Sequence, residues 1–370
     1  MDKATWYQLD RPEEIISPSL LIYPDRIEKN IQTMIRMVGD VQLLRPHIKT
    51  HKMREIIQMQ LDHGIYKFKC ATIAEAELLA KTGAKDILLA YQPAGIHISR
   101  FLALQEAYPA SQFSTLVDNA FSLKEMQAMA AEKKTSISLW IDINNGMDRT
   151  GITPGPEAKM LYLAIVASEY SSAKGFHVYD GHLRNPKFKE RKAACDHAFK
   201  TVLDFKSDLE ASGLSVPAIV AGGSPTFGIH CEREGVEKSP GTTLLWDQGY
   251  GQLFPELDFL HAAVLLTRII SKPTTTYLCF DLGHKSIAPE MNFPRVKFLD
   301  LPESEQLKQS EEHLIVSSST AAHHQVGDIH YALPMHICPT VAKYDQVLTV
   351  NERKVTGAWP VAARNYKIDI

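Results

Sequence analysis

The sequence lacks the features that mark membrane, secreted and nucleic-acid-binding proteins. No stretch approaches the roughly 20 consecutive apolar residues of a membrane helix, and the amino end has no apolar segment of the kind that signal peptides carry. The five cysteines are odd in number and include no C-x-x-C pair, which favours reduced thiols over disulfides. The net charge of -3 gives no electrostatic reason to bind nucleic acid or an anionic membrane. We therefore expect a cytoplasmic protein that acts on a small molecule.

Internal repeats and low-complexity tracts are also absent, and short apolar runs alternate with helical patterns over the first two thirds of the chain. This alternation is typical of βα units around a parallel sheet. The expected strands are residues 43–49, 67–72, 86–91, 112–118, 136–143, 173–181, 217–224 and 242–247. The expected helices are residues 26–38, 54–63, 73–81, 120–132, 156–168 and 187–211. Eight such strands predict a closed (β/α)8 barrel, an α/β fold.

The pattern changes after about residue 255, where strand-like runs follow one another with few helices between them. These runs are residues 264–270, 275–281, 313–318 and 329–335. Residues 19–23 have the pattern of a further strand that precedes the barrel and belongs elsewhere. We therefore predict a barrel domain at residues 25–254 and a β domain at residues 255–370 that also includes residues 1–24.

Lys49 is the first candidate for chemistry. Residues 45–52 read RPHIKTHK and place Lys49 beside two histidines and further cations, directly after an apolar run. Positive neighbours and burial both favour the neutral form of an amine, and a neutral lysine is a nucleophile towards carbonyl groups. Lys49 is therefore a candidate for Schiff-base formation, with His47 as a candidate acid or base. The alternative is a solvated basic turn, the usual setting of such clusters.

Two later turns are suited to phosphate, and both lie at expected strand ends, where the active sites of such barrels are built. Residues 222–226 read GGSPT and offer unhindered backbone N–H groups together with the hydroxyls of Ser224 and Thr226. Residues 239–243 read SPGTT and include Gly241, Thr242 and Thr243. Each turn alone is compatible with an ordinary loop. Combined with a Schiff-base lysine, the two turns point to pyridoxal phosphate.

His336 and Cys338 form a second candidate site, in the expected β domain. On an extended chain, residues two apart point to the same side, so this pair can ligate one cation and leave positions for water and substrate. His313, which follows two glutamates, offers a further histidine to bind substrate or support the ligands. The alternative is a coincidental His-x-Cys pattern in which Cys338 is a buried thiol.

In order and spacing, these motifs resemble the D-threonine aldolase and D-serine dehydratase family. They are RPHxKT at residues 45–50, DRxGI at 148–152, GSPT at 223–226, EH at 312–313 and PxHxC at 334–338. The resemblance covers nearly the whole chain, and the first and last motifs are its specific parts. The family implies an alanine-racemase-like barrel of pyridoxal phosphate fold type III, a β domain, a catalytic divalent metal and a homodimer.

The resemblance also implies roles for individual residues. Lys49 would carry the cofactor and Arg149 would contact its phenolate oxygen. His336 and Cys338 would hold the metal, for which zinc and manganese both remain open. The cofactor phosphate would lie against Ser224, Thr226, Gly241 and Thr243.

Three departures from the family pattern limit the transfer of these residue roles to this chain. Tyr179 follows the sixth strand in a YDGH segment, where many relatives read HAG. Arg184 lies near the place of a tyrosine often assigned to the pyridine nitrogen, which leaves the protonation of that nitrogen open. The turn at residues 239–243 replaces the commoner RAGxY, so the phosphate would depend more on hydroxyls and backbone.

The resemblance implies cleavage of a D-3-hydroxy amino acid to glycine and an aldehyde. A metal would act on the substrate hydroxyl, with metal-bound hydroxide or a nearby histidine as the base. The alternative is a D-serine or D-3-hydroxyaspartate dehydratase, in which Lys49 removes the Cα proton and the products are an α-keto acid and ammonia. We favour the aldolase because the overall resemblance to aldolases is longer. A non-catalytic cofactor carrier and an amino-acid racemase are further alternatives by fold analogy.

Overall fold

The computed structural model describes residues 6–370, which divide into two compact units. The first unit contains the residues up to Thr33 together with Thr50–Ile56 and Thr242–Arg364. The second unit contains Met34–Lys49, Ile57–Gly241 and Asn365–Ile370. Helices α1 (Pro24–Val38) and α2 (Arg54–Asp62) each contain residues of both units. None of the described helices combines the length and the apolarity that crossing a membrane requires.

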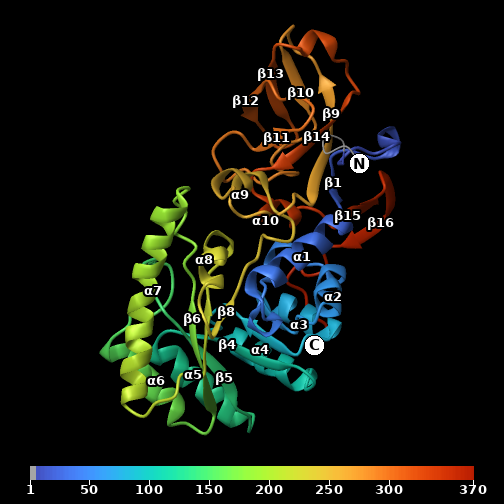
Figure 1. Cartoon of the computed structure of the whole chain (residues 1–370). Coiled ribbons are helices and arrows are strands. Elements are labelled where there is room, and N and C mark those ends of the chain that lie inside the picture. The colour runs from blue at the N-terminus through green and yellow to red at the C-terminus, as the bar shows by residue number, and fades with distance from the viewer. Residues whose placement is uncertain (1–5) are drawn as a thin grey trace. The chain divides into compact units, whose positions relative to one another are not determined.

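The second unit is built on a seven-stranded parallel sheet in the sequential order β2 to β8 (Figure 1). Its strands are β2 (Lys67–Cys70), β3 (Asp86–Leu89), β4 (Gln112–Val117), β5 (Ile137–Asp142), β6 (Ser171–Val178), β7 (Ala218–Ala221) and β8 (Val236–Lys238). Its helices are α3 (Ile73–Thr82), α4 (Ile96–Ala107), α5 (Ala120–Glu132), α6 (Pro156–Val166), α7 (Phe188–Ala211) and α8 (Phe227–Cys231). Sequential parallel strands joined by helices are the topology that the alternating pattern predicted.

Residues 44–47 lie between the two edge strands of this sheet and make single parallel bridges to both. Leu44 bridges Lys238 of β8, and His47 bridges Lys69 of β2. The predicted first strand at residues 43–49 is therefore present only as isolated bridges. Pro46 has no N–H to donate to a ladder, and Ile48–Thr50 turns into a 3-10 helix. The parallel sheet thus has seven regular strands, and an irregular segment stands in place of the predicted first strand of the eight-stranded barrel.

The predicted strand at residues 242–247 is wrong, and β8 takes its place. Residues 242–247 form turns and irregular backbone. The sequence analysis did not predict strand β8, because this strand contains Glu237 and Lys238, whose charges are atypical of a buried strand. Glu237 is nevertheless buried, because its carboxylate accepts hydrogen bonds of 2.6 Å each from Arg45 Nε and Lys67 Nζ.

Arg45 is the centre of this buried ion network. Its side chain is 1% exposed, and its two Nη atoms donate to the two carboxylate oxygens of Asp86 at 2.7 and 2.8 Å. Burial lowers the pKa of Arg45, but the hydrogen bonds and charges of Asp86 and Glu237 outweigh burial and raise it. The network therefore keeps the guanidinium charged inside the sheet.

Removal of one partner of this network should destabilise the protein. We expect Glu237→Ala to lower the free energy of unfolding by about 2–3 kcal/mol, because Arg45 and Lys67 lose their shared anion while Asp86 still pairs with Arg45. The midpoint of urea unfolding measures this loss. Glu132→Ala, which removes an exposed carboxylate at the end of α5, is the matched control and should change the midpoint little. An equal effect of both substitutions would contradict a stabilising role of Glu237 in the buried ion network.

The first unit contains a nine-stranded sheet whose main path runs β12-β13-β10-β9-β1-β15-β16, with β14 pairing β9 and β11. Its strands are β1 (Ser19–Ile22), β9 (Ala263–Ser271), β10 (Tyr277–Phe280), β11 (Val296–Phe298), β12 (Ser304–Gln309), β13 (Leu314–Ser318), β14 (Ile329–Pro334), β15 (Gln346–Asn351) and β16 (Lys354–Pro360). Two short helices, α9 (Gln248–Leu253) and α10 (Ile337–Val341), complete it. Tyr7, Leu21, Val264 and Tyr331 belong to its core.

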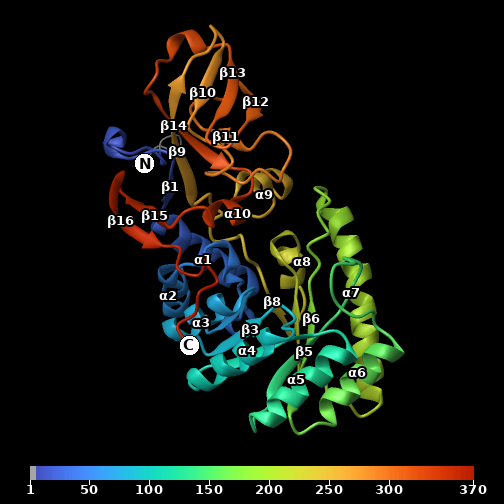
Figure 2. The ribbon, with the colours of Figure 1, turned by 180° about the vertical axis from the view of Figure 1, so that it is seen from behind.

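Strand β1 is the strand expected at residues 19–23, and it joins the sheet of the first unit. It pairs with β9 in antiparallel and with β15 in parallel orientation. Figure 2 shows β15 and β16 beside β1. Strands β11, β12, β15 and β16 were not expected from the sequence. Strand β12, for example, reads SEQLKQ, and its largely exposed polar side chains carry no hydrophobic pattern.

Candidate active site

Three loops of the second unit that follow β5, β6 and β7 meet around Tyr179. The guanidinium carbon of Arg149 lies 5.0 Å from the centre of the Tyr179 ring. On another side, a Cβ on Gly223 would lie 3.0 Å from Cε2 of the ring. Gly181 is also required here, because a Cβ would lie 2.2 Å from the Tyr179 hydroxyl. The two glycines therefore admit an aromatic ring at the edge of the phosphate-type turn.

Lys49 lies in the 3-10 helix Ile48–Thr50 rather than at the end of a regular strand. Its side chain is partly buried, and its backbone N–H donates to Nδ1 of His47 at 3.2 Å. Because Nδ1 accepts this bond, a neutral His47 carries its proton on Nε2. The hydrogen bond fixes the orientation of the His47 ring against the backbone of Lys49.

Hydrogen bonds of Thr226 hold the glycine-rich turn at residues 222–226 in shape. Its N–H at Gly223 donates to Thr226 Oγ1 at 3.3 Å, and the Thr226 hydroxyl donates to Asp180 Oδ1 at 2.6 Å. The single hydroxyl proton of Thr226 is thus committed to Asp180, so Thr226 shapes the turn. Ser224 Oγ accepts from the N–H of Gly241 at 3.2 Å, which joins the two turns that the sequence predicted to bind phosphate.

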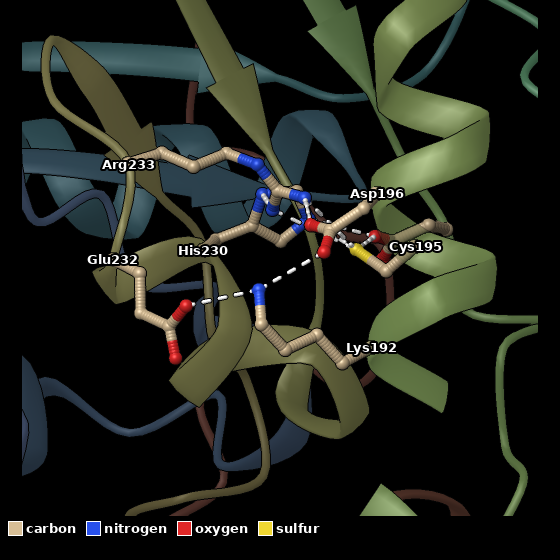
Figure 3. A network of polar contacts seen from close by, with 7 residues as sticks. Lys192, Cys195, Asp196, His230, Glu232 and Arg233 are labelled. Atoms are coloured by element: carbon tan, nitrogen blue, oxygen red, sulfur yellow. Dashed lines mark hydrogen bonds and ion pairs between the residues drawn. The ribbon is translucent and has the colours of Figure 1, made fainter. Parts of the chain in front are cut away.

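Asp180 also anchors a buried network of hydrogen bonds. Figure 3 shows its neighbours Cys195, His230 and Arg233. Oδ2 of Asp180 accepts from His230 Nε2 at 2.7 Å, and Arg233 Nη1 lies 2.7 Å from His230 Nδ1. A guanidinium only donates, so Nδ1 is the acceptor and the proton of His230 is on Nε2. Lys192 forms an ion pair with Asp196 within α7 at 2.9 Å. Its second ion pair, with Glu232 at 3.0 Å, ties α7 to the segment after α8.

Asp180, Cys195 and His230 have the donor atoms of a metal site, since one atom of each lies within 4.8 Å of the others. The hydrogen bonds argue against a cation at this place. Both nitrogens of His230 are engaged, and Arg233 brings a positive charge to 3.6 Å from Cys195 Sγ. Burial and the charge of Asp180 raise the pKa of Cys195 to about 12, so the sulfur is a neutral thiol. We interpret the group as a support for the glycine-rich turn.

Arg184 belongs to the loop that follows β6. Nε of Arg184 donates to the carbonyl of Gly181 at 3.0 Å, which keeps Arg184 beside the loop after β6. Thr242 and Thr243 are buried residues of the first unit. Thr242 Oγ1 lies 3.4 Å from Cys338 Sγ, so its hydroxyl contacts the second candidate site.

His336 and Cys338 lie at the start of α10 in the first unit. The extended geometry expected for both residues holds only for His336, which caps the helix, while Cys338 lies within its first turn. Glu290 Oε1 lies 2.5 Å from Nδ1 of His336, and Thr50 Oγ1 lies 3.1 Å from Cys338 Sγ. Glu290 was missed by the sequence analysis, because nothing in its local sequence links it to a residue 46 positions later.

The charge around His336 suits a cation. Burial lowers the pKa of His336, but its hydrogen bonds with Cys338 and Glu290 and the charges of Cys338 and Asp247 outweigh burial and raise the pKa to about 9. The groups that favour a proton on His336 are those that favour a divalent ion in its place. A nitrogen, a sulfur and a carboxylate oxygen also form an ordinary donor set for a transition metal.

His313 is not joined to this pair by any side-chain hydrogen bond within residues 6–370. It lies exposed in the turn before β13. The adjacent Glu311 and Glu312 form ion pairs with Lys285 at 2.9 and 2.8 Å. A role for His313 stays a prediction.

Comparisons with known proteins match both parts of the chain. The family model of the alanine racemase N-terminal domain matches residues 22–245, and that of a serine dehydratase domain matches residues 262–350. A 3-hydroxy-D-aspartate aldolase of Paracoccus denitrificans (strain Pd 1222) is 27% identical, with 95% of this chain and 92% of the relative covered. A D-threonine aldolase of an Arthrobacter species is 25% identical, with 95% and 93% covered. A D-threo-3-hydroxyaspartate dehydratase of Delftia sp. (strain HT23) is 26% identical over 62% of this chain and 61% of its own.

Solved structures share the fold. The crystal structure of D-threonine aldolase from Filomicrobium marinum superposes with a TM-score of 0.88 at 24% identity, covering 96% of this chain and 97% of the other. A cysteine-to-alanine variant of the Delftia dehydratase, described as the metal-free form, superposes with a TM-score of 0.82 at 21% identity, covering 94% and 98%.

Proposed function

The chain belongs to the family of the alanine racemase N-terminal domain, which matches more than half of its length, and on this premise we propose its function. We propose a pyridoxal phosphate- and divalent metal-dependent lyase that cleaves D-3-hydroxy amino acids to glycine and an aldehyde. The observation that carries the proposal is that one chain contains two groups of residues, one suited to the cofactor and one suited to a metal. Lys49 and the glycine-rich turn suit the cofactor, and His336, Cys338 and Glu290 suit a metal.

The residues of the second unit fit pyridoxal phosphate. Gly181 and Gly223 let the backbone pack closely against Tyr179, since a Cβ would lie 2.2 Å from its hydroxyl at Gly181 and 3.0 Å from its Cε2 at Gly223. A glycine-rich turn of this kind suits a phosphate. Lys49 would hold the cofactor covalently, and Arg149 would supply a fixed positive charge to its phenolate oxygen. Ser224 and Gly241 would orient the phosphate. When bound, the cofactor would supply an electron sink for the bond that breaks at Cα.

The metal set of the first unit would position the substrate oxygen. His336 and Cys338 would be ligands, and Glu290 would either orient His336 through Nδ1 or join the ligands. A divalent ion held there would supply a Lewis acid for the hydroxyl of the substrate. The sulfur of Cys338 suits zinc, whereas the carboxylate of Glu290 also suits manganese. We further propose a homodimer, which light scattering of the purified protein tests.

A dehydratase is the second candidate, because a D-threo-3-hydroxyaspartate dehydratase is among the relatives that the chain resembles. The same donor sets serve both reactions. In the dehydratase, Lys49 would take the Cα proton, and the metal set would stabilise the departing hydroxide. We favour the aldolase because the sequence match to the aldolases extends over 95% of the chain, against 62% for the sequence match to this dehydratase.

Product analysis separates the candidates. We expect D-threonine to give glycine and acetaldehyde in equal amounts, and D-serine to give little keto acid. A chelator should abolish the cleavage, because it removes the metal that the proposed reaction needs as a Lewis acid. Gas chromatography of acetaldehyde and an ammonia assay measure the products.

Other product patterns would redirect the assignment. Keto acid and ammonia in excess of glycine would favour the dehydratase. Chelator-resistant interconversion of D- and L-amino acids would favour a racemase, and binding of the cofactor without turnover would favour a carrier. Equal cleavage of L-threonine would contradict the family-based expectation of D-specificity.

A further inference from the structure

Helix α10 begins at Ile337, between the two proposed metal ligands, and its N-terminal cap is atypical. His336 occupies the N-cap position, but its side chain makes no capping hydrogen bond. This position normally holds Ser, Thr, Asp or Asn, whose side-chain oxygen accepts an N–H of the first turn. The ring of His336 instead forms hydrogen bonds with Glu290 and Cys338. The first turn of α10 therefore needs an acceptor from another part of the chain.

Asp247 supplies this acceptor from the start of α9. Its Oδ2 accepts from the N–H of Ile337 at 3.0 Å, and its Oδ1 accepts from the N–H of Tyr250 at 2.9 Å. Asp247 is itself the N-cap of α9 and is only 2% exposed, so one buried carboxylate caps two helices. Figure 1 shows α9 and α10 side by side within the first unit. Charge-assisted bonds from backbone N–H groups offset the cost of burying such a carboxylate.

Gly249 of α9 makes a second contact with the segment that carries the ligands. Its N–H donates to the carbonyl of Met335 at 3.2 Å. A Cβ at Gly249 would lie 2.4 Å from the same carbonyl oxygen, which is closer than side chains approach backbone atoms. Helix α9 can therefore lie against Met335 because residue 249 is a glycine.

The peptide that joins His336 to Ile337 is held at both of its polar atoms. Its N–H donates to Asp247, and its carbonyl accepts from Oγ1 of the buried Thr340 at 2.8 Å. The chain changes direction at this peptide, because His336 is extended, with φ -139° and ψ 101°, whereas Cys338 lies in the helix. The directions in which the two ligand side chains point therefore depend on the orientation of this peptide.

We propose that Asp247 is a positioning residue for the metal: together with Gly249 it fixes the backbone between His336 and Cys338, so that the imidazole and the sulfur are directed at one ion. The inference rests on the proposed function in one respect, namely that His336 and Cys338 are metal ligands. Both oxygens of Asp247 accept backbone N–H groups, so Asp247 acts through the ligands. Partners of this kind orient metal ligands, and their loss commonly weakens metal binding about 10- to 100-fold.

Metal binding by the full-length protein, freed of metal with a chelator, tests this proposal without any measurement of turnover. Zinc affinity is measured by competition with a chromophoric chelator, and Co²⁺ serves as a spectroscopic probe. We expect Asp247→Asn to bind zinc about tenfold more weakly, because its amide presents only one oxygen and turns an NH₂ group towards the other N–H. The absorption band of a Cys338 thiolate bound to Co²⁺ should weaken as well, because the sulfur is no longer held in place.

Two glycines of α9 provide a matched pair of variants that change no charge. Gly249→Ala displaces the Met335 carbonyl and should also weaken zinc binding about tenfold. Gly251→Ala instead places its Cβ 2.9 Å from the His261 ring, away from the ligand segment. It should leave zinc affinity within about threefold of the unmodified protein, even if it lowers the midpoint of thermal unfolding. The pair therefore separates the position of the ligands from charge and from general stability.

Asp247→Ser replaces the asparagine variant if that variant folds poorly. A single serine oxygen can still cap α9, but it leaves the N–H of Ile337 without its acceptor. Unchanged zinc affinity in either the Asp247 variant or Gly249→Ala, or an equal loss in Gly251→Ala, would overturn the proposal. Absence of the thiolate band in the unmodified protein, or its persistence in Cys338→Ala, would instead contradict the metal ligands of the proposed function.

Discussion

His336→Ala and Cys338→Ala should each abolish carbon–carbon cleavage while the visible absorption of the bound cofactor remains. The two donor sets belong to different units of the chain, so loss of one leaves the residues of the other in place. A Lewis acid on a developing oxyanion contributes several kcal/mol, so we expect a loss of about 4 kcal/mol in transition-state stabilisation, or roughly a thousandfold in kcat/KM. Initial rates with D-threonine and metal content by atomic emission measure the effect.

Cys279→Ala is the matched control for this prediction. Cys279 is a buried cysteine of β10 in the same unit as Cys338. Its removal should lower stability without changing the activity of each folded molecule, because it packs in the sheet. Near-normal specific activity of both site variants, measured after metal removal and refilling, would eliminate His336 and Cys338 as metal ligands.

Lys49→Ala should remove the visible absorption band of the bound cofactor and all lyase activity. The purified protein should be yellow, and borohydride reduction followed by peptide mapping should place the cofactor on Lys49. Lys85→Ala, which removes an exposed lysine before β3, should leave both the band and the mapped peptide unchanged. If the band persists without Lys49 and reduction labels Lys52 or Lys69, the cofactor lysine has been assigned incorrectly.

Glu290 and Lys69 illustrate what sequence patterns leave out. Each lies far along the chain from the histidine that it contacts, and each belongs to a residue type that is usually on the surface. The sequence feature that could have drawn attention to Lys69 is the alternation of side chains along β2, which reads KFKC. Phe68 and Cys70 alternate with Lys67 and Lys69, so both lysines point to the other face of the sheet. Only the neighbouring strands show that this face is buried and lined with partners.

The sequence by itself determined the type of fold and the family, and it predicted the chemistry of the candidate residues. Strand and helix periods are local properties of the chain, and RPHxKT and PxHxC are contiguous motifs, so both can be read without knowledge of distant contacts. The sequence also separated strand 19–23 from the barrel, because its place before the first helix did not fit the βα order.

The tertiary structure alone decided which polar groups are committed to one another. Thr226 was expected as a phosphate neighbour from its hydroxyl, but its proton goes to Asp180, a residue 46 positions away. Glu237 can lie buried in strand β8 because Arg45 and Lys67, 192 and 170 residues distant from it, neutralise its charge. Hydrogen bonds and ion pairs form only where folding brings the donor and acceptor atoms within about 3 Å of each other. No local sequence pattern encodes that distance between distant segments.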